Sequence, residues 1–113
     1  MLKGKIVLVP FPFDDLSSAK LRPAVCLTNK ISQFQHVVLA FITSKTPDPI
    51  MGSDILLNND QPGFSETGLK TSSAIRLHRV ITITTSIIQR ELGNLTPELQ
   101  MQVDEKLRKL FQL

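Results

Sequence analysis

Three short apolar runs near the N-terminus constrain the fold more than any other feature of the sequence. They occupy residues 4–10, 22–28 and 36–42, and each carries β-branched side chains. Prolines or polar turn residues separate the runs, and apolar runs of this length between turns are typical of β-strands. The sequence therefore predicts a β-sheet here, and the third run, apolar nearly throughout, is expected to be a central strand.

Strand-like patterns continue to about residue 95. Residues 54–57 predict a short strand, residues 58–68 a turn-rich segment, and residues 69–84 a longer strand in which apolar residues recur among polar ones. Residues 86–95 fit either a short strand or one helical turn. This succession of short elements predicts a mainly β fold.

The C-terminal segment carries the clearest helix signal. Thr96 is a suitable N-cap, and Pro97 falls at the first helical position, where a missing N–H is tolerated. One apolar stripe follows at helical spacing, formed by Leu99, Val103, Leu107, Leu110 and Phe111. With 113 residues the chain suits one domain, residues 1–113, in which a small curled sheet or barrel is closed by this helix.

Composition indicates the cellular compartment of the protein but does not identify a partner. The formal net charge is +3 and the pI is about 9.3, a mild excess that permits a polyanionic partner without requiring one. The single Cys26 excludes an internal disulfide, and its apolar neighbours predict a buried thiol in a reducing compartment. No apolar run approaches the roughly 20 residues that span a bilayer, and the N-terminus does not resemble a signal peptide. The cytoplasm is the expected location.

Few motifs in the sequence carry recognisable chemistry. There is no glycine-rich phosphate loop and no zinc-ligand spacing, and the adjacent Asp14 and Asp15 are expected to cap a turn, so we expect no metal and no cofactor. What remains is a set of cations, hydroxyls and one imidazole: Arg22, Thr43, Ser44, Ser72, Ser73, Arg76, His78 and Arg79.

Arg22 is the most constrained cation of this set. Pro23 biases it towards an extended backbone, so its guanidinium is expected at the start of a strand. A loop with hydroxyls precedes it, and Phe11 and Phe13 stand at the base of that loop. The two rings are expected in the core, with base stacking as the alternative. A fixed cation beside such a loop predicts a phosphate site.

These residue types suit the cleavage of RNA by its own 2′-hydroxyl. The reaction needs a base for that proton, donors for the charge that builds on phosphorus, and an acid for the leaving 5′ oxygen. Arginine suits the second task, because its fork offers several N–H groups to phosphate oxygens. Thr43 and Ser44 can donate to a phosphate, and His78 can act as acid or base.

Each candidate also has an ordinary structural interpretation, and the sequence leaves both open. Arg22 can form a surface ion pair, while Thr43 and Ser44 can satisfy turn backbone. Strand side chains alternate between faces, so Arg76 and His78 are expected to share one face, where both can be solvated strand residues.

Several blocks of sequence together resemble a known family. They are Gly-Lys-Ile-Val-Leu-Val-Pro-Phe-Pro-Phe at 4–13, Lys-Leu-Arg-Pro-Ala-Val at 20–25, Phe-Ile-Thr-Ser at 41–44, Gly-Leu-Lys-Thr-Ser-Ser-Ala-Ile-Arg at 68–76, and Leu-Gly-Asn-Leu at 92–95. In this order they resemble the PemK/MazF-like toxins of type II toxin–antitoxin systems, over essentially the whole chain.

The resemblance implies a fold and an activity. The fold is an SH3-like small barrel of the plasmid-maintenance toxin type with a C-terminal helix. The activity is that of an mRNA interferase, a hydrolase that works as a metal-independent, sequence-specific endoribonuclease on single-stranded mRNA. The implied partners are a second copy in a homodimer whose interface groove takes RNA, and a cognate antitoxin. DNA is involved only indirectly, through the toxin–antitoxin complex, and no membrane is involved.

The resemblance also implies roles for individual residues. Arg22 matches the arginine beside the scissile phosphate, and Thr43 matches the threonine that ends the third strand. Arg76 and His78 match sheet positions where some members carry an arginine and an acidic residue, so the identity of the general base stays open. These four are the expected catalytic residues, and the expected substrate-binding residues are Phe11, Phe13, Lys20, Ser44, Ser73 and Arg79.

Two alternatives to a ribonuclease remain on the sequence alone. A toxin of the same fold can poison a protein target such as DNA gyrase without cleaving RNA. A plain nucleic-acid-binding barrel is the other, and it predicts salt-dependent binding of RNA and DNA without strand scission.

Overall fold

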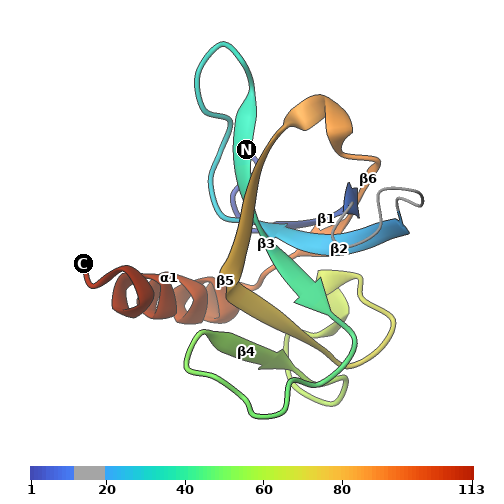
Figure 1. Cartoon of the computed structure of the whole chain (residues 1–113). Coiled ribbons are helices and arrows are strands. Elements are labelled where there is room, and N and C mark those ends of the chain that lie inside the picture. The colour runs from blue at the N-terminus through green and yellow to red at the C-terminus, as the bar shows by residue number, and fades with distance from the viewer. Residues whose placement is uncertain (12–19) are drawn as a thin grey trace.

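A curled antiparallel sheet of six strands with one C-terminal helix makes up the part of the chain that the computed structural model describes, residues 1–11 and 20–113 (Figure 1). Phe11 is described by its backbone alone. The elements are β1 (Lys5–Phe11), β2 (Lys20–Cys26), β3 (His36–Thr43), β4 (Asp54–Leu57), β5 (Ser73–Thr84), β6 (Arg90–Asn94) and α1 (Pro97–Phe111), with 3₁₀ turns η1 (Ser65–Thr67) and η2 (Thr85–Ile87). The expected mainly β fold with a C-terminal helix is confirmed.

The strand order is β4-β5-β3-β2-β1-β6. The third strand along the chain is therefore internal in the sheet, as its apolar sequence predicts. Strands β4 and β6 form the two edges. None of the helical segments in the described residues has the length and apolar character that crossing a bilayer requires.

Strands β1 and β3 match their expected bounds to within one residue, and larger differences occur in three other segments. Strand β2 begins at Lys20, so Arg22 is paired opposite Val9 inside the ladder and is not the first residue of the strand. Strand β5 begins at Ser73, because the residues before it form turns. The ambiguous residues 86–95 contain the end of η2 and then β6, which pairs with β1.

A tight backbone contact joins η1 to the edge strand β6. A Cβ placed on Gly93 would overlap the carbonyl oxygen of Glu66 and the backbone of Thr67. Gly68, which ends η1 with a φ of 73°, lies in the same way against the carbonyl of Leu92. Glycine tolerates both the positive φ and the close approach, so these two positions let η1 cover the strand.

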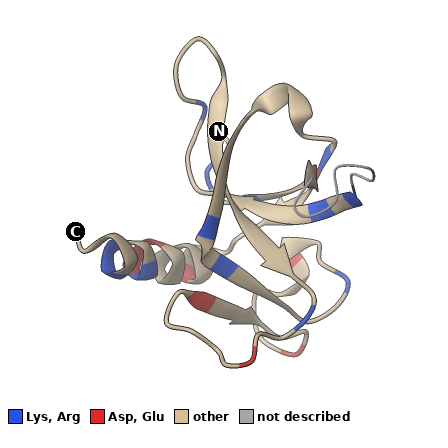
Figure 2. Ribbon diagram, in the orientation of Figure 1, with Lys and Arg blue, Asp and Glu red and all other residues tan. Residues whose placement is uncertain are grey.

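Helix α1 begins as its sequence predicts. The Thr96 side chain accepts a hydrogen bond from the backbone N–H of Leu99 at 3.3 Å, and Pro97 is the first helical residue. The helix carries both red and blue segments, and the blue ones lie towards its C-terminal end (Figure 2). Leu99 and Val103 are buried, but Leu110 and Phe111 are 37% and 58% exposed. The expected apolar stripe is therefore wrong for the last turn.

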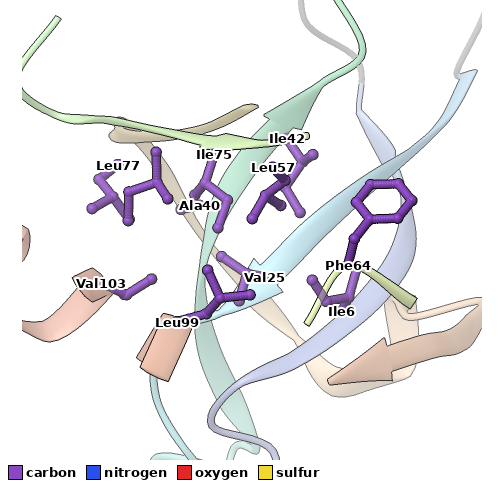
Figure 3. Packing of buried hydrophobic residues seen from close by; sticks show 11 residues of the cluster. Ile6, Val25, Ala40, Ile42, Leu57, Phe64, Ile75, Leu77, Leu99 and Val103 are labelled. Carbon is purple, nitrogen blue, oxygen red and sulfur yellow. The ribbon is translucent and has the colours of Figure 1, made fainter. Parts of the chain in front are cut away.

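Apolar side chains are buried on both faces of the sheet, because strand residues alternate between them. One face packs against the helix: Figure 3 shows Leu99 and Val103 facing Val25, Ala40 and Leu77 of the sheet. The opposite face buries a second cluster, formed by Val7, Val9, Ala24, Cys26, Val37, Leu39 and Phe41. Cys26 is buried as predicted, and Phe41 lies at the end of this second cluster.

Candidate functional site

The ring of Phe41 on β3 lies close to two arginine side chains. The guanidinium carbon of Arg79 is 5.1 Å from the ring centroid, and that of Arg22 is 6.0 Å from it. The two cations come from β5 and β2, the neighbours of β3 on either side, and Figure 2 shows blue segments on both strands. Both distances are within the range of cation–π attraction, so a buried ring helps to hold two exposed cations over one end of the sheet.

An irregularity in β5 brings a third arginine, Arg76, to the same place. Ala40 pairs with Val80, but the next residue of β3, Phe41, pairs with Arg76. Residues 77–79 therefore have no partner on β3, and the N–H of Leu77 donates instead to the carbonyl of Ser53 at 2.9 Å. In a regular strand positions 76 and 79 would lie on opposite faces. Here Arg76 and Arg79 line one pocket.

This pocket has a volume of about 390 Å³. Its described lining residues are Phe41, Thr43, Lys45, Thr46, Pro47, Asp48, Arg76 and Arg79. Among them three are cations and one is an anion, and two carry hydroxyl groups. Such a lining suits an anionic group that accepts several hydrogen bonds, as a phosphate does.

Arg76 is held in place by a buried carboxylate. Its Nε donates to Oδ1 of Asp54 at 3.0 Å, and its Nη2 lies 3.5 Å from Sδ of Met51. Asp54 stands directly opposite Arg76 in the pairing of β4 with β5, and its side chain has no exposed surface. Sequence reasoning missed Asp54, because that register links residues far apart in the chain.

Thr43 and Ser44 lie where β3 ends. Thr43 is half-buried and lines the pocket, and its Oγ1 accepts a hydrogen bond from the N–H of Lys45 at 3.1 Å. That bond uses an acceptor position, so the hydroxyl hydrogen can still donate. Ser44 is exposed beside it. The turn role and the anion-binding role are thus compatible for Thr43.

His78 points to a different neighbour. Its Nδ1 is 2.7 Å from Oγ of Ser53, the residue before Asp54. The imidazole is exposed and is not among the described residues that line the pocket. Arg76 and His78 therefore both contact the segment that leads into β4, while Arg79 joins Arg76 in the pocket.

The expected substrate-binding residues are only partly brought together. Lys20 is exposed at the start of β2, two residues from Arg22. Ser73 donates to the carbonyl of Thr71 at 2.9 Å, which is a turn contact. The Phe11 side chain, Phe13, Asp14 and Asp15 lie outside the described residues. Within residues 1–11 and 20–113, no group of His, Cys, Asp and Glu side chains is arranged to hold a metal ion.

Comparison with known proteins identifies a family for the chain. The model for the PemK-like, MazF-like toxin of type II toxin–antitoxin systems matches residues 2–111. A search of curated proteins found no significant sequence match.

Solved structures share the fold at low identity. The Mycobacterium tuberculosis toxin MazF-mt6 superposes with a TM-score of 0.73 at 19% identity, covering 96% of this chain and 97% of its own. An endoribonuclease from a mycobacterial species, solved in complex with its cognate antitoxin, gives a TM-score of 0.75 at 13% identity, covering 100% of this chain and 96% of its own. A further mycobacterial endoribonuclease gives 0.71 at 13% identity, with coverages of 100% and 92%. At these identities the likeness concerns the fold.

Proposed function

Because the chain belongs to the PemK-like, MazF-like toxins of type II toxin–antitoxin systems, we propose that it is a toxin that cleaves single-stranded RNA. The observation that carries the proposal is the convergence of Arg22, Arg76 and Arg79 around Phe41 and its pocket. Neighbours of the same fold are described as endoribonucleases, which supports the same activity.

The proposed reaction uses the 2′-hydroxyl of the RNA as nucleophile. Its oxygen bonds to the adjacent phosphorus, its proton goes to a base, and the bond from phosphorus to the 5′ oxygen breaks. The products are a 2′,3′-cyclic phosphate and a 5′-hydroxyl, which takes up one proton. All bonds that change belong to the RNA, so the protein's tasks are to place the phosphate, stabilise its charge and move protons.

The arginines and the threonine bind the scissile phosphate and stabilise its charge. Arg22 stabilises the charge on the pentavalent phosphorus and donates to the leaving 5′ oxygen. Arg76 and Arg79 donate to the non-bridging oxygens from the other side of Phe41, and the Thr43 hydroxyl holds the same group in register. Lys20 and Ser44 contact neighbouring nucleotides at the exposed rim.

We assign proton transfer to His78, the imidazole nearest the pocket. The chain has two histidines, and His36 lies at the opposite end of β3 from Thr43, paired with Thr84. His78 follows Arg76 by two residues, and Ser53 fixes its Nδ1, which leaves Nε2 towards solvent and substrate. The assignment puts a histidine at a position where the resemblance implies an acidic residue in some members.

The proposal also covers the antitoxin, the oligomeric state and the cellular location of the enzyme. A cognate antitoxin would bind and silence it, in keeping with a neighbour that was solved with its antitoxin. We further propose one domain over residues 1–113, a homodimer as the active form, and the cytoplasm as the place where it meets mRNA.

Cleavage of a defined RNA in EDTA tests the activity. Purified wild-type protein is incubated with single-stranded RNA and with DNA of the same sequence, and only the RNA should be cut, because DNA lacks the 2′-hydroxyl. Arg22→Ala should cut about a hundredfold more slowly. Arg108→Ala removes an exposed arginine of α1 and should leave the rate unchanged.

The products discriminate between this proposal and its alternatives. RNA fragments with cyclic phosphate ends, formed at the wild-type rate by Arg22→Ala, would remove Arg22 from the mechanism. Intact RNA with salt-dependent binding of both nucleic acids would instead identify a binding barrel.

A further inference from the structure

We propose that Asp54 is a positioning residue that holds Arg76 in the orientation in which it receives the scissile phosphate. The inference rests on the proposed function, because it assigns the cause of a side-chain geometry at that site. Asp54 does not line the pocket and has no exposed side-chain surface, so any effect on substrate acts through Arg76.

Both carboxylate oxygens of Asp54 have defined partners. Oδ1 accepts from Nε of Arg76 at 3.0 Å, and Oδ2 accepts from the backbone N–H of Met51 at 2.9 Å. The N–H of Asp54 in turn donates to the carbonyl of Met51 at 3.0 Å, which closes a tight turn. The carboxylate is thus fixed by backbone before it meets the guanidinium.

Asp54 binds the Nε of Arg76, and this determines which N–H groups of the guanidinium remain available to a ligand. A guanidinium has five N–H donors in a planar fork, and Asp54 takes the donor on Nε. The terminal amino groups stay at the end of the side chain, where Nη2 has a weak contact with the Met51 sulfur at 3.5 Å. These groups are the ones that a phosphate can bind, and a side chain fixed at Nε presents them in one plane.

Register keeps this geometry in place. Arg76 is paired with Asp54 on one side and with Phe41 on the other, so it stands between the buried carboxylate and the aromatic wall of the pocket. A free arginine loses side-chain rotamer entropy on being ordered. Here folding orders the side chain before substrate arrives, which is the condition for efficient charge stabilisation.

A double-mutant cycle on cleavage tests the inference. The variants are Asp54→Asn, Arg76→Ala and the pair combined, assayed for kcat and KM on one RNA. Asparagine has the same shape, but one of its two terminal atoms is an NH2 donor, so it cannot accept at both positions, from Arg76 Nε at one and from the Met51 N–H at the other. We expect Asp54→Asn to lower kcat by about tenfold to a hundredfold with a smaller change in KM. The combined variant should cleave at the rate of Arg76→Ala alone.

The control is Asp104→Asn on α1. Asp104 also accepts a side-chain hydrogen bond, from Gln100 at 2.9 Å, and pairs with Lys3, but it lies away from the pocket. It should leave kcat unchanged. Melting temperatures are measured for every variant, and kcat is compared at a temperature where all are folded.

Three results would overturn the inference. They are an unchanged kcat for Asp54→Asn, a kcat loss that is fully retained in the Arg76→Ala background, and a loss seen in KM alone. A wild-type protein that cuts no RNA would remove the proposed function, and binding of 2′-O-methyl RNA then decides the inference. Asp54→Asn must weaken that binding only while Arg76 is present, and equal weakening in both backgrounds, or no binding by wild type, overturns it.

Discussion

The guanidinium of Arg79 lies over the ring of Phe41, with 5.1 Å between the guanidinium carbon and the ring centroid. The ring is buried at the end of the second apolar cluster of the sheet. Packing of the core and placement of a cation at the pocket therefore depend on the same side chain, and substitutions of Phe41 can separate the two contributions.

Phe41→Leu should slow RNA cleavage while the protein stays folded. Leucine keeps most of the buried volume, so the free energy of unfolding should fall by less than about 1.5 kcal/mol. It removes the π face that attracts Arg22 and Arg79, contacts worth about 0.5–1 kcal/mol each, so cleavage should slow by about fivefold to thirtyfold. Leu39→Met, in the same cluster, should change neither property strongly, and equal cleavage by both variants would contradict the role of the ring.

Gly93→Ala should destabilise the fold at the contact between η1 and β6. The new methyl group would meet the backbone of Glu66 and Thr67, which cannot rotate away, and overpacking of this kind costs about 1–3 kcal/mol. Gly52→Ala is the matched control, because nothing lies within 4 Å of its added Cβ. Urea unfolding of both variants checks the prediction, and it fails if they lose the same stability.

The stability of the protein should fall between about pH 9 and pH 11 because of Cys26. Burial, with a smaller contribution from the carboxylate of Glu91, raises the pKa of this thiol from 9.0 to about 11. Below pH 9 the thiol is protonated in both states. Above pH 9 the Cys26 thiol ionises in the unfolded chain while it stays protonated in the folded protein. This difference favours unfolding by an amount on the order of 2 kcal/mol by pH 11.

Cys26→Ala isolates this contribution from that of the titrating lysines. The difference in unfolding free energy between wild type and variant should shrink as pH rises from 9 to 11, and a constant difference would contradict the argument. The buried thiol should also resist alkylation in the native protein near neutral pH and react once the chain is unfolded.

Thr96→Ala should weaken the start of α1. The lost hydrogen bond to the N–H of Leu99 is an N-cap interaction, worth about 0.5–2 kcal/mol. Thr96→Ser keeps the accepting oxygen and should retain most of the stability. Thermal unfolding of the three proteins measures the effect, and equal losses in both variants would exclude the cap as its cause.

Local sequence patterns predict most of the elements of this fold. The apolar residues 36–42 predict an internal strand because both faces of β3 are buried, and Thr96 with Pro97 marks the helix start because capping chemistry is local. The helical stripe does not show how far the sheet extends beneath α1, so the exposure of Leu110 and Phe111 could not be predicted.

The candidate site is predictable in part. Arg22, Thr43 and Arg76 were expected from residue chemistry and from the resemblance, and they lie in or beside one pocket. Asp54 could not be found, because its role depends on the register of β4 against β5. Arg79 is among the expected substrate-binding residues, but strict alternation would place it on the opposite face from Arg76, so the pocket that the two share depends on the irregularity of β5.

Residues 77–79 of β5, which have no partners on β3, separate the residue paired with Phe41 from the residue paired with Ala40. Continuous pairing of β5 with β3 would shift the later residues of β5 by three positions, so that Arg79 would face away from Arg76 and Ile81 and Ile83 would face away from the second apolar cluster. The spacing between the two arginines is therefore as much a property to compare among relatives as their identity.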